Sequence, residues 1–205
     1  VWELLGRVGA ERTAHGVIES LQTYPALNGL ETTLRMDPGW PGHRPGQFAF
    51  AMSNPKEGPH PYTLASAWVP EDRRITFITK ALGDHTRRLP ERLQVGDRVT
   101  VEGPYGCFTF DDGRARQIWI GAGLGITPFI ARMKYLAQHK GRDARPVDLF
   151  HPTSDADPQA IEKLRADSQA AGVALHLFID KKDGRLTGER LRAMVPGWKD
   201  ASVWF

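Results

Sequence analysis

The sequence predicts a chain with two differently built parts: an antiparallel β-barrel or sandwich, followed by a parallel β-sheet wound with helices. In the first part, short segments rich in β-branched and aromatic residues alternate with turn residues. In the second part, apolar strand segments alternate with segments whose apolar residues recur at helical spacing. Strands that alternate with helices indicate a parallel sheet. The pattern changes near Asp112, so we expect domains at residues 1–112 and 113–205.

The first part carries strand and turn signals. Residues 30–34 and 74–78 combine threonine with aliphatic and aromatic residues, as strands do. Proline-containing turns separate such segments at residues 37–39, 44–46, 54–55 and 58–59. One helix is expected after Gly83, running through Leu89 to Leu93. These signals favour a small all-β domain with one helix.

The second part predicts four strands and three helices. The expected strands are residues 117–120, 147–150, 175–179 and 202–205. Thr127 is the predicted N-cap of the first helix, and Pro128 its first-turn proline. The second helix begins after Asp157 and ends at Ala171, and a short third helix starts at Thr187.

Composition and charge exclude several classes of protein. The net charge is only +3 and the basic residues are scattered, which argues against nucleic-acid binding. Cys107 is the only cysteine, so an internal disulfide and a cysteine-built metal site are excluded. The seven histidines lack the spacing of a metal site, and we expect no metal. No apolar run is long enough to span a bilayer.

The two ends of the sequence carry expectations of their own. The first residues lack the basic and apolar regions of a signal peptide. The absence of an initiator methionine suggests processing or an excised fragment. The last residues, 202–205, form an apolar, strand-like run, and we therefore expect that the second domain is truncated at its C-terminus.

A glycine-rich turn connects the first strand and first helix of the second part. Gly121, Gly123 and Gly125 precede Thr127 and Pro128. Such glycines let the backbone approach a ligand, and the helix start offers N–H groups and partial positive charge to a phosphate. The spacing departs from the usual dinucleotide fingerprint at Ile126. Tight strand–helix packing without a ligand is the alternative interpretation.

Five segments in a fixed order carry a family resemblance. They are residues 44–48, 60–66, 80–86 and 102–106, followed by the glycine turn. This ordered set resembles the ferredoxin–NADP reductase superfamily. It looks most like the flavin and nucleotide domains of ferric reductases and NADPH oxidases. The resemblance covers about residues 12–205 and implies a flavin-binding β-barrel followed by a nucleotide-binding α/β domain.

The resemblance implies an FAD site on a barrel strand. His60, Pro61, Tyr62 and Thr63 match the family's Arg-x-Tyr-Ser/Thr motif, with histidine in place of arginine as in the ferric reductase branch. In the family, the tyrosine lies against the isoalloxazine ring and the following hydroxyl bonds near N5. A flat aromatic side chain suits stacking on a flat ring. The alternative is that Tyr62 is a core aromatic residue and Thr63 an ordinary strand residue.

The next segment would contact the diphosphate of the flavin. By resemblance, Gly83, His85 and Thr86 lie at a helix start, which presents N–H groups and a hydroxyl, and Lys80 adds positive charge. Thr86 is alternatively, or in addition, a helix N-cap. Residues 102–106 look like the family's barrel-closing loop, with a structural role.

The glycine turn would then bind NADPH or NADH. The resemblance places Thr127 near the nicotinamide and flavin rings, which makes Thr63, Tyr62 and Thr127 the expected catalytic set. An N-cap role for Thr127 alone is the alternative. Thr153 or Ser154, after the second strand of the sheet, can bind either nucleotide, and the family resemblance leans slightly towards NADPH.

The implied activity is hydride transfer from NAD(P)H to FAD, followed by release of single electrons. In a ferric reductase-like parent, the acceptor is a haem-bearing transmembrane domain of the same polypeptide, and this part lies on the cytoplasmic face of the membrane. The family's Cys-Gly-Pro segment, which follows a strand like residues 203–205, is absent. The alternatives are a soluble flavin reductase that donates to ferredoxin or a diffusible acceptor, and a non-catalytic nucleotide-binding module.

Overall fold

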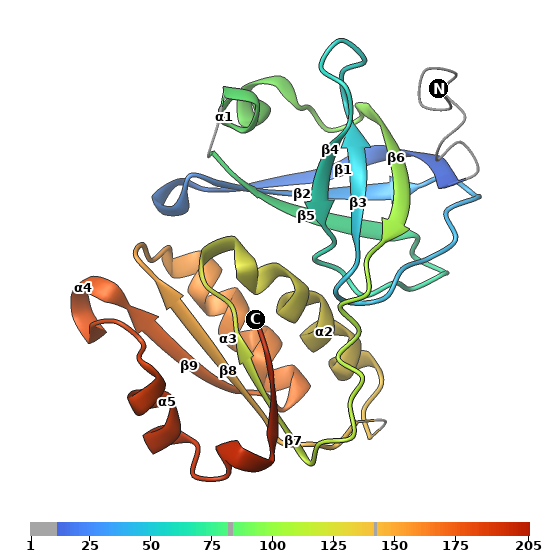
Figure 1. The fold of residues 1–205 in the computed structure, drawn as a ribbon. Helices are drawn as coiled ribbons and strands as arrows, with labels where there is room; N and C mark the ends of the chain where they lie inside the picture. Colours follow the sequence, from blue (N-terminus) through green and yellow to red (C-terminus); the bar gives the residue numbers. More distant parts are fainter. Residues whose placement is uncertain (1–11, 82–83, 142) are drawn as a thin grey trace, which may run out of the picture.

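The computed structural model describes residues 12–81, 84–141 and 143–205. Its first part is an antiparallel sheet of six strands in the order β4-β3-β6-β1-β2-β5 (Figure 1). The two outer strands touch through one bridge between Leu64 and Phe77, which closes the sheet into a barrel. The strands are β1 (Thr13–Tyr24), β2 (Gly29–Met36), β3 (Phe48–Met52), β4 (His60–Thr63), β5 (Arg74–Lys80) and β6 (Arg98–Tyr105).

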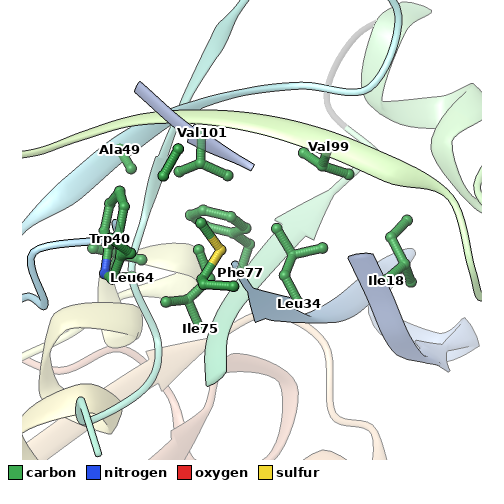
Figure 2. Close-up of a cluster of buried hydrophobic side chains, with 11 residues drawn as sticks. Ile18, Leu34, Trp40, Ala49, Leu64, Ile75, Phe77, Val99 and Val101 are labelled. Carbon is green, nitrogen blue, oxygen red and sulfur yellow. The ribbon is translucent and has the colours of Figure 1, made fainter. Parts of the chain in front are cut away.

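The barrel core is aliphatic and aromatic. Figure 2 shows Ile18, Leu34, Phe77 and Val99 directed toward one another between the strands, and each is at most 6% exposed. Helix α1 (Asp84–Arg92) places Leu89 and the following Leu93 toward this interior. The helix predicted after Gly83 is therefore present. Strand β6 extends through Tyr105, so most of the segment expected to be a closing loop is strand.

The second part is a four-stranded sheet in the order β10-β7-β8-β9, with every pair parallel. Its strands are β7 (Arg116–Ile120), β8 (Val147–Thr153), β9 (Ala174–Ile179) and β10 (Ala201–Trp204). Phe129, Met133 and Leu164, from α2 (Thr127–Gln138) and α3 (Pro158–Ala171), join the apolar cluster that contains Trp119 and Leu149. The β-barrel followed by a parallel α/β sheet agrees with the predicted fold class.

The opposite face of this sheet has its own cluster. Ile118, Phe150 and Phe178 pack with Val195 and with Leu191 of α5 (Gly188–Met194). Short helices connect the elements: η3 (Pro25–Leu27), η4 (Gly123–Ile126), α4 (Asp180–Asp183) and η5 (Trp198–Asp200). Among the residues that the structure describes, no helix is long and apolar enough to cross a membrane.

The helix starts agree with the sequence prediction at two positions and differ at two. The Asp157 carboxylate accepts hydrogen bonds from the backbone N–H groups of Gln159 and Ala160, and Thr187 caps α5 in the same way. Thr127, however, is not the N-cap of α2: it is the first helical residue, and Ile126 occupies the cap. Thr86 lies inside α1, which begins at Asp84, so the N-cap alternative for Thr86 is also wrong.

The segment between the two sheets is fastened by Asp112. Its carboxylate accepts hydrogen bonds from Gln117 Nε2 (2.7 Å), Ser202 Oγ (2.7 Å) and Trp204 Nε1 (3.1 Å), and Arg145 lies 2.9 Å away. Burial alone would raise the pKa of Asp112, but these hydrogen bonds lower it to about 2. One carboxylate thus joins the connecting segment to β7, β10 and the loop before β8.

Replacing this carboxylate should destabilise the fold. Asp112→Asn removes the charge beside Arg145 and puts an N–H₂ group where only acceptors are needed, so we expect a loss of roughly 1–3 kcal/mol in the free energy of unfolding. Urea titration at neutral pH measures it. Asp111→Asn, at the exposed neighbouring residue, is the matched control. Equal stability of the two variants would contradict the role of Asp112.

His43, in the segment between β2 and β3, is a buried histidine. Its ring is 9% exposed and lies between Trp40 and Trp68, with centroids 6.4 and 5.8 Å away. Nε2 lies 2.9 Å from the Ser66 carbonyl oxygen, which only accepts, so the neutral ring carries its proton on Nε2. Nδ1 is buried and has no hydrogen-bond partner in the described part of the chain. Burial lowers the pKa of His43 to about 4, because protonation would place a proton on this unpaired atom.

The stability of the protein should therefore fall as the pH drops from about 6.5 towards 4. In this window the unfolded chain binds a proton at position 43 that the folded chain does not, which amounts to on the order of 3 kcal/mol across the full range. His43→Gln removes the titration and should flatten the pH dependence of urea unfolding. His15→Gln, at an exposed histidine, should leave it unchanged. A slope unaffected by His43→Gln would refute the assignment.

Candidate functional site

The open end of the barrel holds the first of two hollows, here called the barrel-mouth hollow. Its volume, part of which is open to solvent, is about 490 Å³, and its lining includes His60, Tyr62, Thr79, Leu89 and Leu93. The Tyr62 ring packs on Phe77, with centroids 5.7 Å apart. Burial and the nearby Glu57 raise the pKa of Tyr62 to about 12, so the phenol is neutral at physiological pH.

Strand β4 divides the predicted flavin motif between two faces. Tyr62 lies opposite Ala49, which is fully buried in the barrel core. Thr63 lies opposite Phe48, and Pro61 opposite Phe50, on the other face of the strand. His60 and Tyr62 line the barrel-mouth hollow, whereas Pro61 and Thr63 do not. The structure thus brings together one half of this motif and directs the other half elsewhere.

The second hollow, here called the interdomain hollow, lies between the barrel and the second sheet. Its volume, part of which is open to solvent, is about 890 Å³, and its lining includes Lys80, Gly123, His151 and Asp155. Lys80 Nζ of β5 lies 3.8 Å from Asp155 Oδ2, which follows β8. Thr79 lines both hollows, so strand β5 borders each of them. Thr153, predicted as a nucleotide contact, lines the interdomain hollow as well.

A group of charged side chains from the barrel and from α3 lines the interdomain hollow. Glu31 of β2 accepts hydrogen bonds from Lys163 Nζ of α3 at 2.5 and 2.7 Å and from the Tyr24 hydroxyl at 3.1 Å. Burial would lower the pKa of Lys163, but its bonds to Glu31 raise it. Burial raises the pKa of the neighbouring Asp167. These groups tie the barrel to the helices of the second sheet.

The glycine turn serves packing at one position and leaves space at two others. A Cβ on Gly121 would lie 2.8 Å from Ile126 Cα, so only glycine fits there. A Cβ on Gly123 or Gly125 would meet nothing within 4 Å. Gly123, with φ of +51°, lines the interdomain hollow. Gly121 thus serves close packing and Gly123 leaves its backbone accessible, and ligand binding at the turn stays a prediction.

Thr127 is nearly inaccessible. It is 2% exposed, and its hydroxyl donates to the Leu124 carbonyl oxygen at 2.7 Å. Thr127, Pro128, Gly121 and Gly125 do not line either hollow. Gly83 and the side chain of His85, expected at the flavin diphosphate, lie outside the described residues. Thr86 is half-buried in α1.

Sequence reasoning missed two sets of residues at the site. His151 directly follows the apolar run of β8, and the rule that ligands bind at the carboxyl ends of parallel strands would have found it. Glu31 and Lys163 are separated by 132 positions, and no local pattern marks their pairing.

Known proteins share sequence similarity with part of this chain. No family model matches the chain. It is 29% identical over 133 residues to the propane 2-monooxygenase reductase component of Mycolicibacterium smegmatis, a match that covers 58% of this chain and 38% of the relative. The flavohemoprotein of Deinococcus radiodurans is 29% identical over 124 residues (58% of this chain, 30% of the relative). NADPH oxidase 1 of Mus musculus is 35% identical over 80 residues (37% and 13%).

Solved structures show the same arrangement. The flavohem-like FAD/NAD-binding domain of nitric oxide dioxygenase from Vibrio cholerae superposes with a TM-score of 0.76 at 19% identity, covering 93% of this chain and 85% of that one. The ferredoxin reductase in carbazole 1,9a-dioxygenase gives 0.73 at 20% identity, with 93% and 60% coverage. The chain fits the ferredoxin–NADP reductase superfamily. The resemblance that its ordered motifs predicted is thus confirmed at the level of this superfamily.

Within this superfamily fold, the Glu31–Lys163 pair should contribute to stability. Glu31→Gln leaves the Lys163 ammonium without its carboxylate, and we expect a loss of about 1–2 kcal/mol, reduced from the buried-pair value because Lys163 is partly exposed. Urea unfolding measures the loss. Glu162→Gln, at an exposed glutamate one residue from Lys163, provides the control. If both variants unfold alike, the pair contributes nothing.

Proposed function

We propose that this chain is the reductase part of an electron-transfer protein, which takes a hydride from NAD(P)H onto FAD and passes single electrons onward. Residues 1–112 would bind the flavin and residues 113–205 the nicotinamide nucleotide. The single observation that carries the proposal is the pair of hollows that share Thr79 in their linings, one in the barrel and one between the barrel and the second sheet. The aligned segment spans 38% of its propane monooxygenase relative, so the activity of a whole protein is part of the proposal.

The residues of the barrel-mouth hollow fit a flavin. Tyr62 offers a half-buried aromatic ring beside apolar Leu89 and Leu93. His60 lies on the same face of β4, and Lys80, at the end of β5, places a cation in the neighbouring interdomain hollow. A flat, partly apolar ring system with a charged tail matches this combination. When bound, FAD supplies the two-electron to one-electron conversion, and the protein supplies position and fixed charge.

The residues of the interdomain hollow fit a dinucleotide. Gly123 leaves its backbone accessible, and Thr153 and Asp155 lie at the carboxyl end of β8, where open α/β sheets bind ligands. Glu31 and Lys163 hold the barrel against α3, which fixes the barrel relative to the second sheet. Hydride transfer depends on such alignment of two rings rather than on a side-chain acid or base.

For the acceptor, we propose a haem, carried by a transmembrane domain of the same polypeptide with this part on the cytoplasmic face. The histidine at position 60 and the match to NADPH oxidase 1 support this ferric reductase-like arrangement. The reductase component and flavohemoprotein relatives favour a second candidate, an oxygenase or haem partner without a membrane domain. Reconstitution with either acceptor, followed by the rate of haem reduction, separates the two.

The reductase activity has a direct test. We expect NADH or NADPH to bleach the oxidised-flavin absorbance of the full-length, FAD-loaded protein under anaerobic conditions. Tyr62→Leu keeps the apolar volume of the side chain but removes the ring, and it should weaken FAD binding by about 5- to 10-fold. Tyr62→Phe keeps the ring and should bind like the wild type.

Two results would argue against the proposal. Flavin that stays oxidised at saturating NADH and NADPH would exclude reductase activity and favour a non-catalytic nucleotide-binding module. An FAD affinity unchanged by Tyr62→Leu, with circular dichroism confirming the fold, would remove Tyr62 from the flavin site.

A further inference from the structure

His151 lies where the second sheet meets the interdomain hollow. It follows Phe150 in β8, at the carboxyl end of the strand, and its ring lines the hollow together with Gly123 and Thr153. Nδ1 lies 2.5 Å from the carbonyl oxygen of Gly121, the first residue of the glycine turn. The Gly121 N–H donates in turn to the Phe150 carbonyl oxygen at 2.9 Å. His151 and Phe150 together therefore fix both backbone groups of Gly121.

This contact determines which nitrogen of His151 carries the proton. A carbonyl oxygen only accepts, so Nδ1 must be the donor and the neutral ring has its lone pair on Nε2. Burial lowers the pKa of His151, which keeps the ring neutral at physiological pH. Nε2 has no hydrogen-bond partner in the described part of the chain, and it is not among the fully buried atoms that lack one. The ring thus presents one free acceptor on the side of the hollow.

The free acceptor at His151 Nε2 can bind only a ligand group that donates a hydrogen bond. Phosphate oxygens carry no proton to donate at neutral pH, and the carboxylate of Asp155 in the same hollow adds negative charge. Ribose hydroxyls do donate, and the end of the second strand of an open α/β sheet is a place where ribose hydroxyls are bound by an acceptor. The chemistry of the position therefore favours a ribose hydroxyl over a phosphate.

We propose that His151 is a positioning residue for the dinucleotide: Nε2 accepts a hydrogen bond from a ribose hydroxyl, while Nδ1 holds the glycine turn through Gly121. The inference rests on the proposed function, because it needs a dinucleotide in the interdomain hollow. It adds one specific contact to that function: the same imidazole ring bonds the glycine turn through Nδ1 and the ribose through Nε2.

The two nitrogens of His151 can be tested separately. In His151→Asn, the amide nitrogen stands at the same number of bonds from Cα as Nδ1, so the bond to Gly121 is kept while the Nε2 acceptor is lost. We expect the dissociation constants of NADH and of ADP-ribose to rise about 3- to 10-fold, with KM for NADH rising and kcat retained. FAD affinity and the urea midpoint should stay close to the wild type, which a purely structural role would not allow.

The chain offers a matched control. His139, at the end of α2, also places Nδ1 near a backbone carbonyl oxygen, that of Tyr135 at 2.9 Å, but it does not line the hollow. His139→Asn should leave both dissociation constants unchanged. His151→Phe keeps the ring but loses both hydrogen bonds, so it should weaken binding and also lower the urea midpoint.

The outcomes separate this inference from the proposed function. Wild-type protein that binds NADH and ADP-ribose, with His151→Asn binding both equally well, overturns the role of His151 and leaves the reductase proposal standing. Weakening of NADH but not of ADP-ribose moves the contact to the nicotinamide end and overturns the ribose assignment. Wild-type protein that binds neither probe overturns both the inference and the proposed function.

Discussion

The candidate site depends on the short pairing between the two outer strands of the barrel, β4 and β5. Strands β4 and β5 meet through the single bridge between Leu64 and Phe77. If antiparallel pairing continued outward from this bridge, Tyr62 would lie opposite Thr79. The two strands do not pair there, and both residues line the barrel-mouth hollow instead. One bridge closes the barrel enough to bury its core, and the missing pairs beyond it leave the opening that a flavin would need.

The second sheet contributes its carboxyl edge to the interdomain hollow. Parallel strands have their carboxyl ends at the same edge of the sheet. The residues after β7 and β8 are therefore close in space although they are far apart in the sequence. Gly121 allows α2 to pack tightly, because no side chain fits between it and Ile126. That close packing carries Gly123 and His151 to the interdomain hollow. The same turn therefore has one glycine, Gly121, that allows close packing and another, Gly123, that lines the hollow.

Local patterns predicted the elements well because they report local physics. The Asp157 cap and the Thr187 cap both follow from side chains that reach their own helix starts. Thr127 failed as a cap because the glycine-rich residues before it form η4, whose Leu124 carbonyl accepts the Thr127 hydroxyl. Neighbouring residues of a strand face opposite sides, but the assignment of Tyr62 rather than Thr63 to the core face depends on the pairing of β4 with β3, which a motif does not carry.

The distance between the barrel and the second sheet is fixed by side chains from distant parts of the chain. Lys163 reaches Glu31 from α3, and Lys134 Nζ of α2 donates to the Ala65 carbonyl oxygen at 3.2 Å just past β4. The connecting segment alone could not fix this distance, since Asp112 fastens it only to the second sheet. Two rings can exchange a hydride only over a narrow range of separation. These charged contacts between barrel and helices, of which Glu31 and Lys163 line the interdomain hollow, are therefore as much a part of the proposed site as the residues that would touch a ligand.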